Sequence, residues 1–139
     1  MTWAERASRR FDEAGFRSGA ARRQVIELLE GEHCALTALE IDRRLPKVGR
    51  ASVYRTLEQL EELELVYRVD VGGETAAYER NDPTGHHHHM VCGRCGRLVP
   101  FSDQALERAI HRVAERAEFK VSAHDVLLRG TCPRCQGQD

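Results

Sequence analysis

Hydrophobic positions in residues 1–64 recur at three- and four-residue intervals among charged ones, a spacing that predicts amphipathic helices. The first run, residues 3–14, stops at Gly15, and the second, residues 20–29, stops at Gly31. Glycine commonly follows the last turn of a helix because it adopts the left-handed conformation without strain. We therefore expect two helices that end at these glycines.

A short helix and a longer one are expected next. Thr37, with Glu40 three residues later, is typical of a capping box, and Pro46 stops the short helix that follows. The longer helix opens at Gly49. Its apolar face is formed by Val53, Leu57, Leu60 and Leu63.

Two strand-like runs follow these helices. Residues 65–71 and 75–80 are separated by Gly72-Gly73, and a glycine pair between such runs indicates a hairpin. Three helices, a fourth helix and a hairpin, in this order, are typical of a winged helix-turn-helix. In that fold the last helix enters the major groove of DNA and the hairpin lies beside it.

The second half of the chain has a different pattern. Residues 81–85 form the most turn-rich stretch and are expected to be a linker. Beyond it, strands are expected at 86–92, 98–101 and 121–128, with a helix at 103–117. We expect the helix to turn Leu106, Ile110 and Val113 inward. The whole chain is therefore predicted to have an α+β fold.

Composition limits the class of protein. The chain has 139 residues, of which 41% are hydrophobic and 31% charged, so it is long enough for one ordinary domain or two small ones. We expect neither a transmembrane helix nor a signal peptide, because no apolar run approaches membrane length and charge interrupts the N-terminal apolar positions. A cytoplasmic protein without a membrane partner is the expectation.

The formal net charge of −1 does not by itself indicate a nucleic-acid binder. Its distribution is more informative. Residues 1–57 hold eleven Lys and Arg against eight Asp and Glu, whereas residues 58–82 hold two against eight. A polyanion is therefore expected to meet the N-terminal segment.

Two Cys-x-x-Cys pairs, Cys92 with Cys95 and Cys132 with Cys135, predict a metal site. Each pair presents two thiolates from one turn, and two turns supply a closed tetrahedral set at Zn–S distances of about 2.3 Å. A site without an open position is expected to be structural. Two disulfides are disfavoured in the cytosol, and the spacing is not the usual one for an iron–sulfur cluster.

Four consecutive histidines precede Cys92. On a strand, His86 and His88 point to one face and His87 and His89 to the other, so each pair can bind a separate metal ion. A solvated polar stretch or an expression tag is the alternative. Each ion needs about two further ligands, for which Glu107 and His124 are candidates. His111 is a competing ligand, although an exposed helical histidine is the more common state.

Several motifs together resemble one known family. They are Gly15-Phe-Arg-Ser with Arg22, Ala51-Ser-Val-Tyr-Arg-Thr-Leu57, HHHHMVCGRCG at 86–96, and His124 followed by Gly130-Thr-Cys-Pro-Arg-Cys135. Over nearly its whole length the chain resembles the ferric uptake regulator (Fur) family of bacterial metal-responsive repressors, most closely the zinc-sensing Zur branch. The resemblance implies a winged-helix DNA-binding domain at 1–80, a hinge at 81–85, and an α/β dimerisation and metal-binding domain at 86–139.

The resemblance also implies metal ligands. One structural Zn²⁺ per subunit would be held by Cys92, Cys95, Cys132 and Cys135. A regulatory ion, Zn²⁺ or else Fe²⁺, Mn²⁺ or Ni²⁺, would be held by His86, His88, Glu107 and His124. A second ion at the hinge would be held by His87, His89, Glu79 and His33.

The hinge set departs from the family pattern at three positions. Ala35 stands where iron sensors carry a histidine, with His33 and Cys34 just upstream. Pro100 aligns with a later acidic ligand, and Asn81 stands where the Zur branch has a cysteine. The identity of the metal is left open by these departures.

For DNA, the resemblance implies base contacts from Tyr54 and Arg55. The expected phosphate contacts are Arg17, Arg22, Arg50 and Ser52. A solvated basic face is the alternative for the arginines, and an aromatic at the edge of the core is the alternative for Tyr54. Gly19-Ala20 replaces the Thr-Pro-like pair that usually opens the second helix.

The implied function is a metal-dependent repressor that binds palindromic operator DNA as a homodimer and controls metal-uptake genes. Iron- or nickel-responsive and peroxide-sensing (PerR-type) regulators of the same family are alternatives. An enzyme is not expected, nor is a small organic substrate. A zinc-dependent hydrolase is a remote alternative, because HExxH is absent and every residue of the best site is already a ligand.

Overall fold

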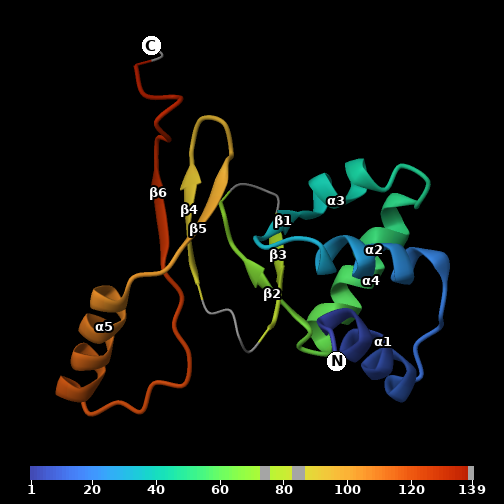
Figure 1. The fold of residues 1–139 in the computed structure, drawn as a ribbon, viewed down its shortest axis with the longest axis horizontal. Helices are drawn as coiled ribbons and strands as arrows, with labels where there is room; N and C mark the ends of the chain where they lie inside the picture. Colours follow the sequence, from blue (N-terminus) through green and yellow to red (C-terminus); the bar gives the residue numbers. More distant parts are fainter. Residues whose placement is uncertain (73–75, 83–86, 138–139) are drawn as a thin grey trace. The chain divides into compact units, whose positions relative to one another are not determined.

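The computed structural model describes residues 1–72, 76–82 and 87–137, and the chain divides into two compact units, Met1–Gly85 and His86–Asp139 (Figure 1). Each unit is described by itself. Within the described residues, no helix combines the length and hydrophobicity needed to cross a membrane.

The first unit contains four helices, and their ends follow the local sequence. They are α1 (Trp3–Ala14), α2 (Ala20–Glu30), α3 (Ala38–Arg44) and α4 (Arg50–Glu62). The predicted capping box is confirmed at α3, where the Thr37 side chain accepts from the Glu40 backbone and the Glu40 side chain accepts from the Thr37 backbone. Gly15 ends α1 with a φ of 78°, the left-handed conformation expected there.

A small antiparallel sheet lies at one edge of these helices (Figure 1). Its strands are β1 (Leu36–Thr37), β2 (Val66–Val69) and β3 (Ala77–Arg80), in the order β1-β3-β2. The predicted hairpin is confirmed, with shorter strands than expected, while part of its turn lies outside the described residues. β1 was not predicted, because two residues are too few to produce a periodic pattern.

The hydrophobic core of this unit joins all four helices to the sheet. Phe11, Val25, Ile41 and Leu57 are fully buried in it. Trp3 is 2% exposed, and its indole N–H donates to the carbonyl oxygen of Leu65 at 2.8 Å. The first unit therefore has an apolar core, as the spacing of its hydrophobic residues predicts.

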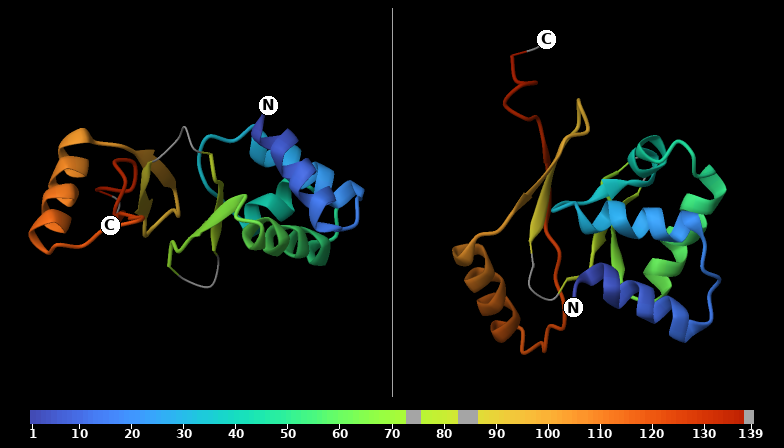
Figure 2. Two further views of the ribbon diagram at one scale, coloured as in Figure 1. Left: turned by 90° about the horizontal axis from the view of Figure 1, so that it is seen from below. Right: turned by 45° about the vertical axis from the view of Figure 1, so that its right-hand side comes forward.

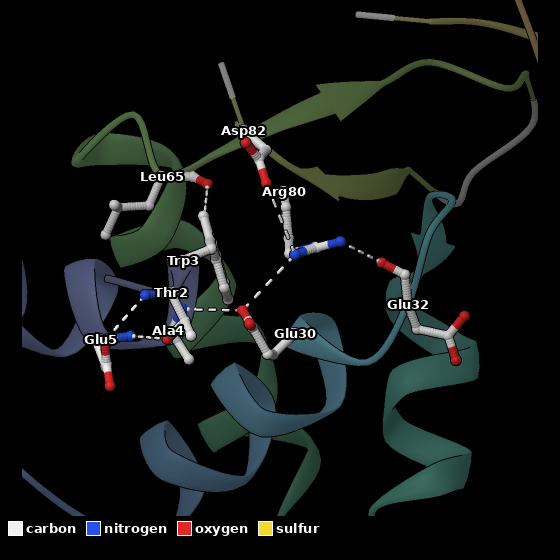
Figure 3. Close-up of polar contacts among 9 residues, drawn as sticks. All are labelled: Thr2, Trp3, Ala4, Glu5, Glu30, Glu32, Leu65, Arg80 and Asp82. Atoms are coloured by element: carbon white, nitrogen blue, oxygen red, sulfur yellow. Dashed lines mark hydrogen bonds and ion pairs between the residues drawn. The ribbon is translucent and has the colours of Figure 1, made fainter. Parts of the chain in front are cut away.

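Polar contacts around Arg80 join the end of β3 to α2 (Figure 3). The guanidinium donates to the carbonyl oxygen of Glu32 at 3.0 Å and lies 3.7 Å from a Glu30 carboxylate oxygen and 4.0 Å from one of Asp82. The Glu30 carboxylate also accepts from the backbone N–H of Ala4 at 3.0 Å, in the first turn of α1. One arginine thus holds three segments of the first unit together.

We predict that Arg80→Leu lowers the free energy of unfolding of the first unit by about 1 to 3 kcal/mol, the range expected when a charge-assisted hydrogen bond is lost. Urea unfolding followed by circular dichroism measures the change. Arg23→Leu, at an exposed arginine of α2, is the control and is expected to change stability by less than about 0.5 kcal/mol. Equal stability of the two variants would contradict the assigned role of Arg80.

The second unit is a three-stranded sheet with one helix. Its elements are β4 (His88–Cys92), β5 (Leu98–Phe101), α5 (Gln104–Arg116) and β6 (Leu127–Gly130). The strand order is β5-β4-β6, with β5 antiparallel and β6 parallel to the central β4. The long connection from α5 to β6 runs without a helix or strand (Figure 2).

Two expectations for this unit are wrong. The strand predicted at 121–128 is β6, Leu127–Gly130, instead. The chain must cross from the end of α5 before it can pair in parallel with β4, and residues 118–126 form this crossover. Val113, predicted to face inward, is 59% exposed, and α5 buries none of its residues within this chain.

Burial in the second unit differs in kind from burial in the first. Among its described residues, the buried side chains are Cys92, Cys135, His88 and His89. Each of these belongs to a predicted set of metal ligands. The described part of the second unit therefore buries potential metal ligands, whereas the first unit buries mainly apolar side chains.

Candidate metal centres and DNA-contacting residues

The four cysteines of the two Cys-x-x-Cys pairs meet at one end of the second unit. Cys92 closes β4, and Cys132 follows β6, its parallel neighbour in the sheet. The Gly93 N–H donates to the Gly130 carbonyl oxygen at 2.8 Å, which fixes the two turns against each other. All four sulfur atoms lie within 4.8 Å of one another.

Hydrogen bonds prepare part of this cluster for ionisation. The backbone N–H of Cys132 donates to the Cys92 sulfur at 3.3 Å and, with that of Cys95, lowers the pKa of Cys92 to about 6. The backbone N–H of Cys135 lowers the pKa of Cys132. Hydrogen bonding with Cys132, together with desolvation, raises the pKa of Cys135 to about 12. A full set of four thiolates therefore requires a cation, and this donor set fits Zn²⁺.

We predict that Cys92→Ser and Cys132→Ser each remove one zinc ion per protomer and unfold the second unit, because ligation supplies folding free energy there. Zinc content by elemental mass spectrometry, with backbone amide spectra of both units, measures the effect. Cys34→Ser, at the half-buried cysteine of the first unit, is the matched control and should retain zinc and fold. Serine variants of Cys92 and Cys132 that stay folded without zinc would contradict this prediction.

A second group forms where three elements of the second unit meet. Nε2 of His88, on β4, lies 2.6 Å from one carboxylate oxygen of Glu107, on α5. Nε2 of His124, on the crossover, lies 2.7 Å from the other oxygen. One possible ligand atom from each of the three residues lies within 4.8 Å of the other two. The three atoms are therefore close enough to bind the same metal ion.

Charge in this group is set by Glu107. The hydrogen bond with His88, and then that with His124, lowers the pKa of the Glu107 carboxyl, while burial acts in the opposite direction. The carboxylate is therefore ionised at neutral pH, as a metal ligand must be. His86 lies outside the described residues. His111 is exposed and pairs with Glu115 at 3.4 Å, as expected for a surface histidine.

The tautomer of His88 is set by a backbone contact. The N–H of Val126 donates to Nδ1 of His88 at 3.2 Å, so the neutral ring carries its proton on Nε2 and donates it to Glu107. A metal ion bound at Nε2 would require this proton to lie on Nδ1 instead. The Val126 contact would then be lost, which would couple filling of the site to the position of the crossover.

We predict that the neutral His88 ring is protonated on Nε2 in the protein without an exchangeable ion and on Nδ1 after loading. Long-range ¹H–¹⁵N correlation spectra distinguish the two tautomers directly. His111, exposed on α5, serves as the control ring and should not change its tautomer. The same His88 tautomer in both forms would rule out ligation through Nε2.

The predicted hinge set is divided between the two units. In the second, the rings of His87 and His89 lie edge to face with centroids 4.9 Å apart, while His88 between them turns toward Glu107. This confirms the alternation expected of a strand. In the first, Glu79 on β3 is 5% exposed, and His33 is exposed on the loop after α2. The hinge site itself stays a prediction.

Most predicted DNA contacts gather on the first unit near the start of α2. A hollow of about 340 Å³ is lined by four of them, Arg17, Arg22, Ser52 and Arg55. The N-cap of α2, Gly19, makes no side-chain hydrogen bond, so the first backbone N–H groups have no side-chain cap and favour an anion. Tyr54 is 40% exposed on α4, which suits a side chain that reaches out to a base.

Two of the predicted phosphate contacts also have structural partners. Arg22 is largely buried, with its guanidinium 3.1 Å from the Asp12 carboxylate and 5.0 Å above the Phe11 ring. Arg50 donates to the Asp42 carboxylate at 3.1 Å but keeps 68% of its side chain exposed. Arg22 thus anchors α2 to α1. The Arg50 side chain is exposed and is therefore accessible to a phosphate.

The chain matches known proteins along most of its length. The model of the family described as "Ferric uptake regulator family" matches residues 13–129. The ferric uptake regulation protein of Legionella pneumophila is 35% identical over 134 residues, which cover 93% of this chain and 98% of that protein. That of Bacillus subtilis (strain 168) is 35% identical over 121 residues, covering 83% and 81%.

A solved structure gives the same result. The crystal structure of the ferric uptake regulator of Vibrio cholerae superposes with a TM-score of 0.79 at 28% identity, covering 88% of this chain and 96% of that one. The α+β architecture and the winged helix-turn-helix are those of such regulators. Proteins of this family are dimeric, metal-binding regulators that bind DNA, and they are not enzymes.

Proposed function

Because the chain belongs to the ferric uptake regulator family, we propose that it is a cytoplasmic, metal-responsive repressor of metal-uptake genes. It binds palindromic operator DNA as a homodimer when its regulatory sites are loaded. One observation carries this proposal: the chain joins a winged-helix unit to a second unit whose buried described side chains all belong to candidate metal sites.

The proposed ligands follow the groups within each unit. Cys92, Cys95, Cys132 and Cys135 hold one structural Zn²⁺ per subunit. His88, Glu107 and His124, with His86, hold the regulatory ion. His87, His89, Glu79 and His33 are proposed for the second ion, from the resemblance rather than from a measured distance.

The second unit converts ion binding into a change of conformation. A bound ion would supply the positive charge that the imidazole and carboxylate ligands coordinate together. Glu107 holds His88 and His124 in place, and an ion held by Nε2 of His88 would displace the Val126 N–H from Nδ1, which would give the crossover a second state. An ion that binds one state more tightly shifts the population toward it. Metal and operator then strengthen each other's binding by the same factor.

Reading of DNA is assigned to the first unit. Arg55 can pair with a guanine edge, and the exposed Tyr54 ring can pack on a thymine methyl group. Arg17, Arg50 and Ser52 position the unit on phosphates, with Arg22 mainly anchoring the helices.

A homodimer is supported by an exposed apolar row on the second unit. Met90 pairs with Val99 on one side and Leu128 on the other, so the three side chains lie on one face of the sheet. Met90 is 40% and Leu128 49% exposed, and the row borders a hollow of about 490 Å³. Such a face on a small unit marks an interface, and we assign it to a second copy.

Zinc is the regulatory metal that we propose. Histidine-rich donor sets with one carboxylate suit Zn²⁺, and the resemblance to the zinc-sensing branch favours it. Iron is the second candidate, favoured by the relatives in Legionella pneumophila and Bacillus subtilis, both named for ferric uptake regulation. Imidazole also suits iron and nickel, so a measurement must decide.

The test measures binding to a duplex that the zinc-loaded protein selects from a random pool. With only the four-cysteine zinc retained, affinity is expected to fall about 5- to 150-fold, the usual range of such coupling. Titration with Zn²⁺ should restore it at a lower free concentration than Fe²⁺, Mn²⁺ or Ni²⁺ does. Restoration by Fe²⁺ first would assign iron, and undiminished affinity without any exchangeable ion would refute metal control.

We predict that His88→Ala binds the selected duplex no better with zinc than without it, because the regulatory ion loses a buried ligand. His111→Ala removes an exposed histidine from the same unit and should respond like the unchanged protein. Fluorescence anisotropy of the labelled duplex measures both. A normal zinc response from His88→Ala would exclude His88 as a regulatory ligand.

A further inference from the structure

One phenol on the hairpin of the first unit contacts a proposed ligand directly. Tyr67 on β2 is the in-register partner of Glu79 on β3, and its hydroxyl donates to Oε2 of Glu79 at 2.9 Å. Glu79 is 5% exposed and Tyr67 is half-buried. We propose that Tyr67 is a positioning residue that orients the Glu79 carboxylate toward a divalent cation, an inference that rests on the proposed ligand role of Glu79.

The chemistry of the donor suits this role. A buried carboxylate needs hydrogen-bond donors to offset the loss of water. A neutral phenol supplies one donor and leaves the negative charge in place, whereas a paired arginine would balance that charge. Arg80, the next residue, is instead engaged by Glu30 and the Glu32 carbonyl oxygen. The Tyr67 hydroxyl thus orients the Glu79 carboxylate without neutralising it.

The surrounding sheet makes the orientation rigid. β2 and β3 pair from Val66 opposite Arg80 to Val69 opposite Ala77. β1 pairs with the other edge of β3, so Glu79 lies on the central strand. Outer-shell hydrogen bonds of this kind fix the direction of a ligand and raise metal affinity. An ion on Glu79 is therefore also fixed relative to the strand that carries Tyr67.

The test compares Tyr67→Phe, Glu79→Gln and Tyr78→Phe in the full chain with its four-cysteine zinc retained. Affinity for Co²⁺ and Zn²⁺ is measured by competition with a chelating dye, and the visible absorption of bound Co²⁺ is recorded. The ion whose affinity falls in Glu79→Gln is the ion that depends on this carboxylate. Tyr67→Phe should weaken that same ion about 10- to 100-fold and shift its Co²⁺ absorption, as loss of an outer-shell partner does.

Tyr78→Phe is the matched control, because it removes a hydroxyl from the neighbouring position of the same strand. It should leave affinity and absorption unchanged. Loss of the ion in Glu79→Gln with normal binding in Tyr67→Phe would overturn the positioning role alone. Normal binding in Glu79→Gln would instead overturn the ligand role of Glu79 and, with it, this inference.

Discussion

The second unit is constrained by what it buries. In its described part, the side chains withdrawn from water are two thiols and two imidazoles, while hydrophobic residues such as Met90, Val113 and Leu128 are exposed. Burial of apolar surface is the main favourable contribution to folding, and a unit this small has little of it. Its stability must come from elsewhere. Metal coordination and a second copy on the exposed apolar face are the two sources that its surface and interior offer.

The first unit has the opposite character. Its core extends from Trp3 to Tyr78 and includes all four helices, and Arg80 ties three segments together at its edge. We therefore propose that it presents Tyr54 and Arg55 to DNA from a helix that its own core holds in place. In the proposed function, regulation depends on the second unit and on the Glu79 carboxylate. A stable reading unit joined to a metal-dependent unit is a physical basis for switching DNA binding on and off.

Local signals made much of this predictable from the sequence. Helix periodicity with caps at Gly15 and Thr37 gave the helices, and the spacing of the cysteines gave their cluster. Strand alternation correctly separated His88 from His87 and His89. The false strand at 121–128 came from a chance alternation of side chains, since periodicity does not reveal that a crossover is needed. The exposure of Val113 could not be foreseen, because helical spacing assigns a residue to the apolar face but does not show whether anything packs against that face.

Two contacts had weaker signals. A two-residue turn at Gly72-Gly73 would pair Tyr67 with Tyr78, whereas the observed register pairs Tyr67 with Glu79, so the expected turn did not predict that bond. The contact from Val126 to His88 joins a backbone amide to a ring across 38 positions, and no side-chain pattern encodes it. Both contacts orient a proposed ligand rather than supply one. Sequence reasoning therefore indicated the proposed ligands more readily than the groups that orient them.

Hydrogen exchange of backbone amides tests most directly whether metal holds the second unit together. The protein would be compared with zinc bound and after removal of all metal under reducing conditions. We predict that amides of β4 and β6 lose protection on metal removal while those of α2 and α4 keep theirs. Equal protection of β4 and β6 in both states would contradict the account.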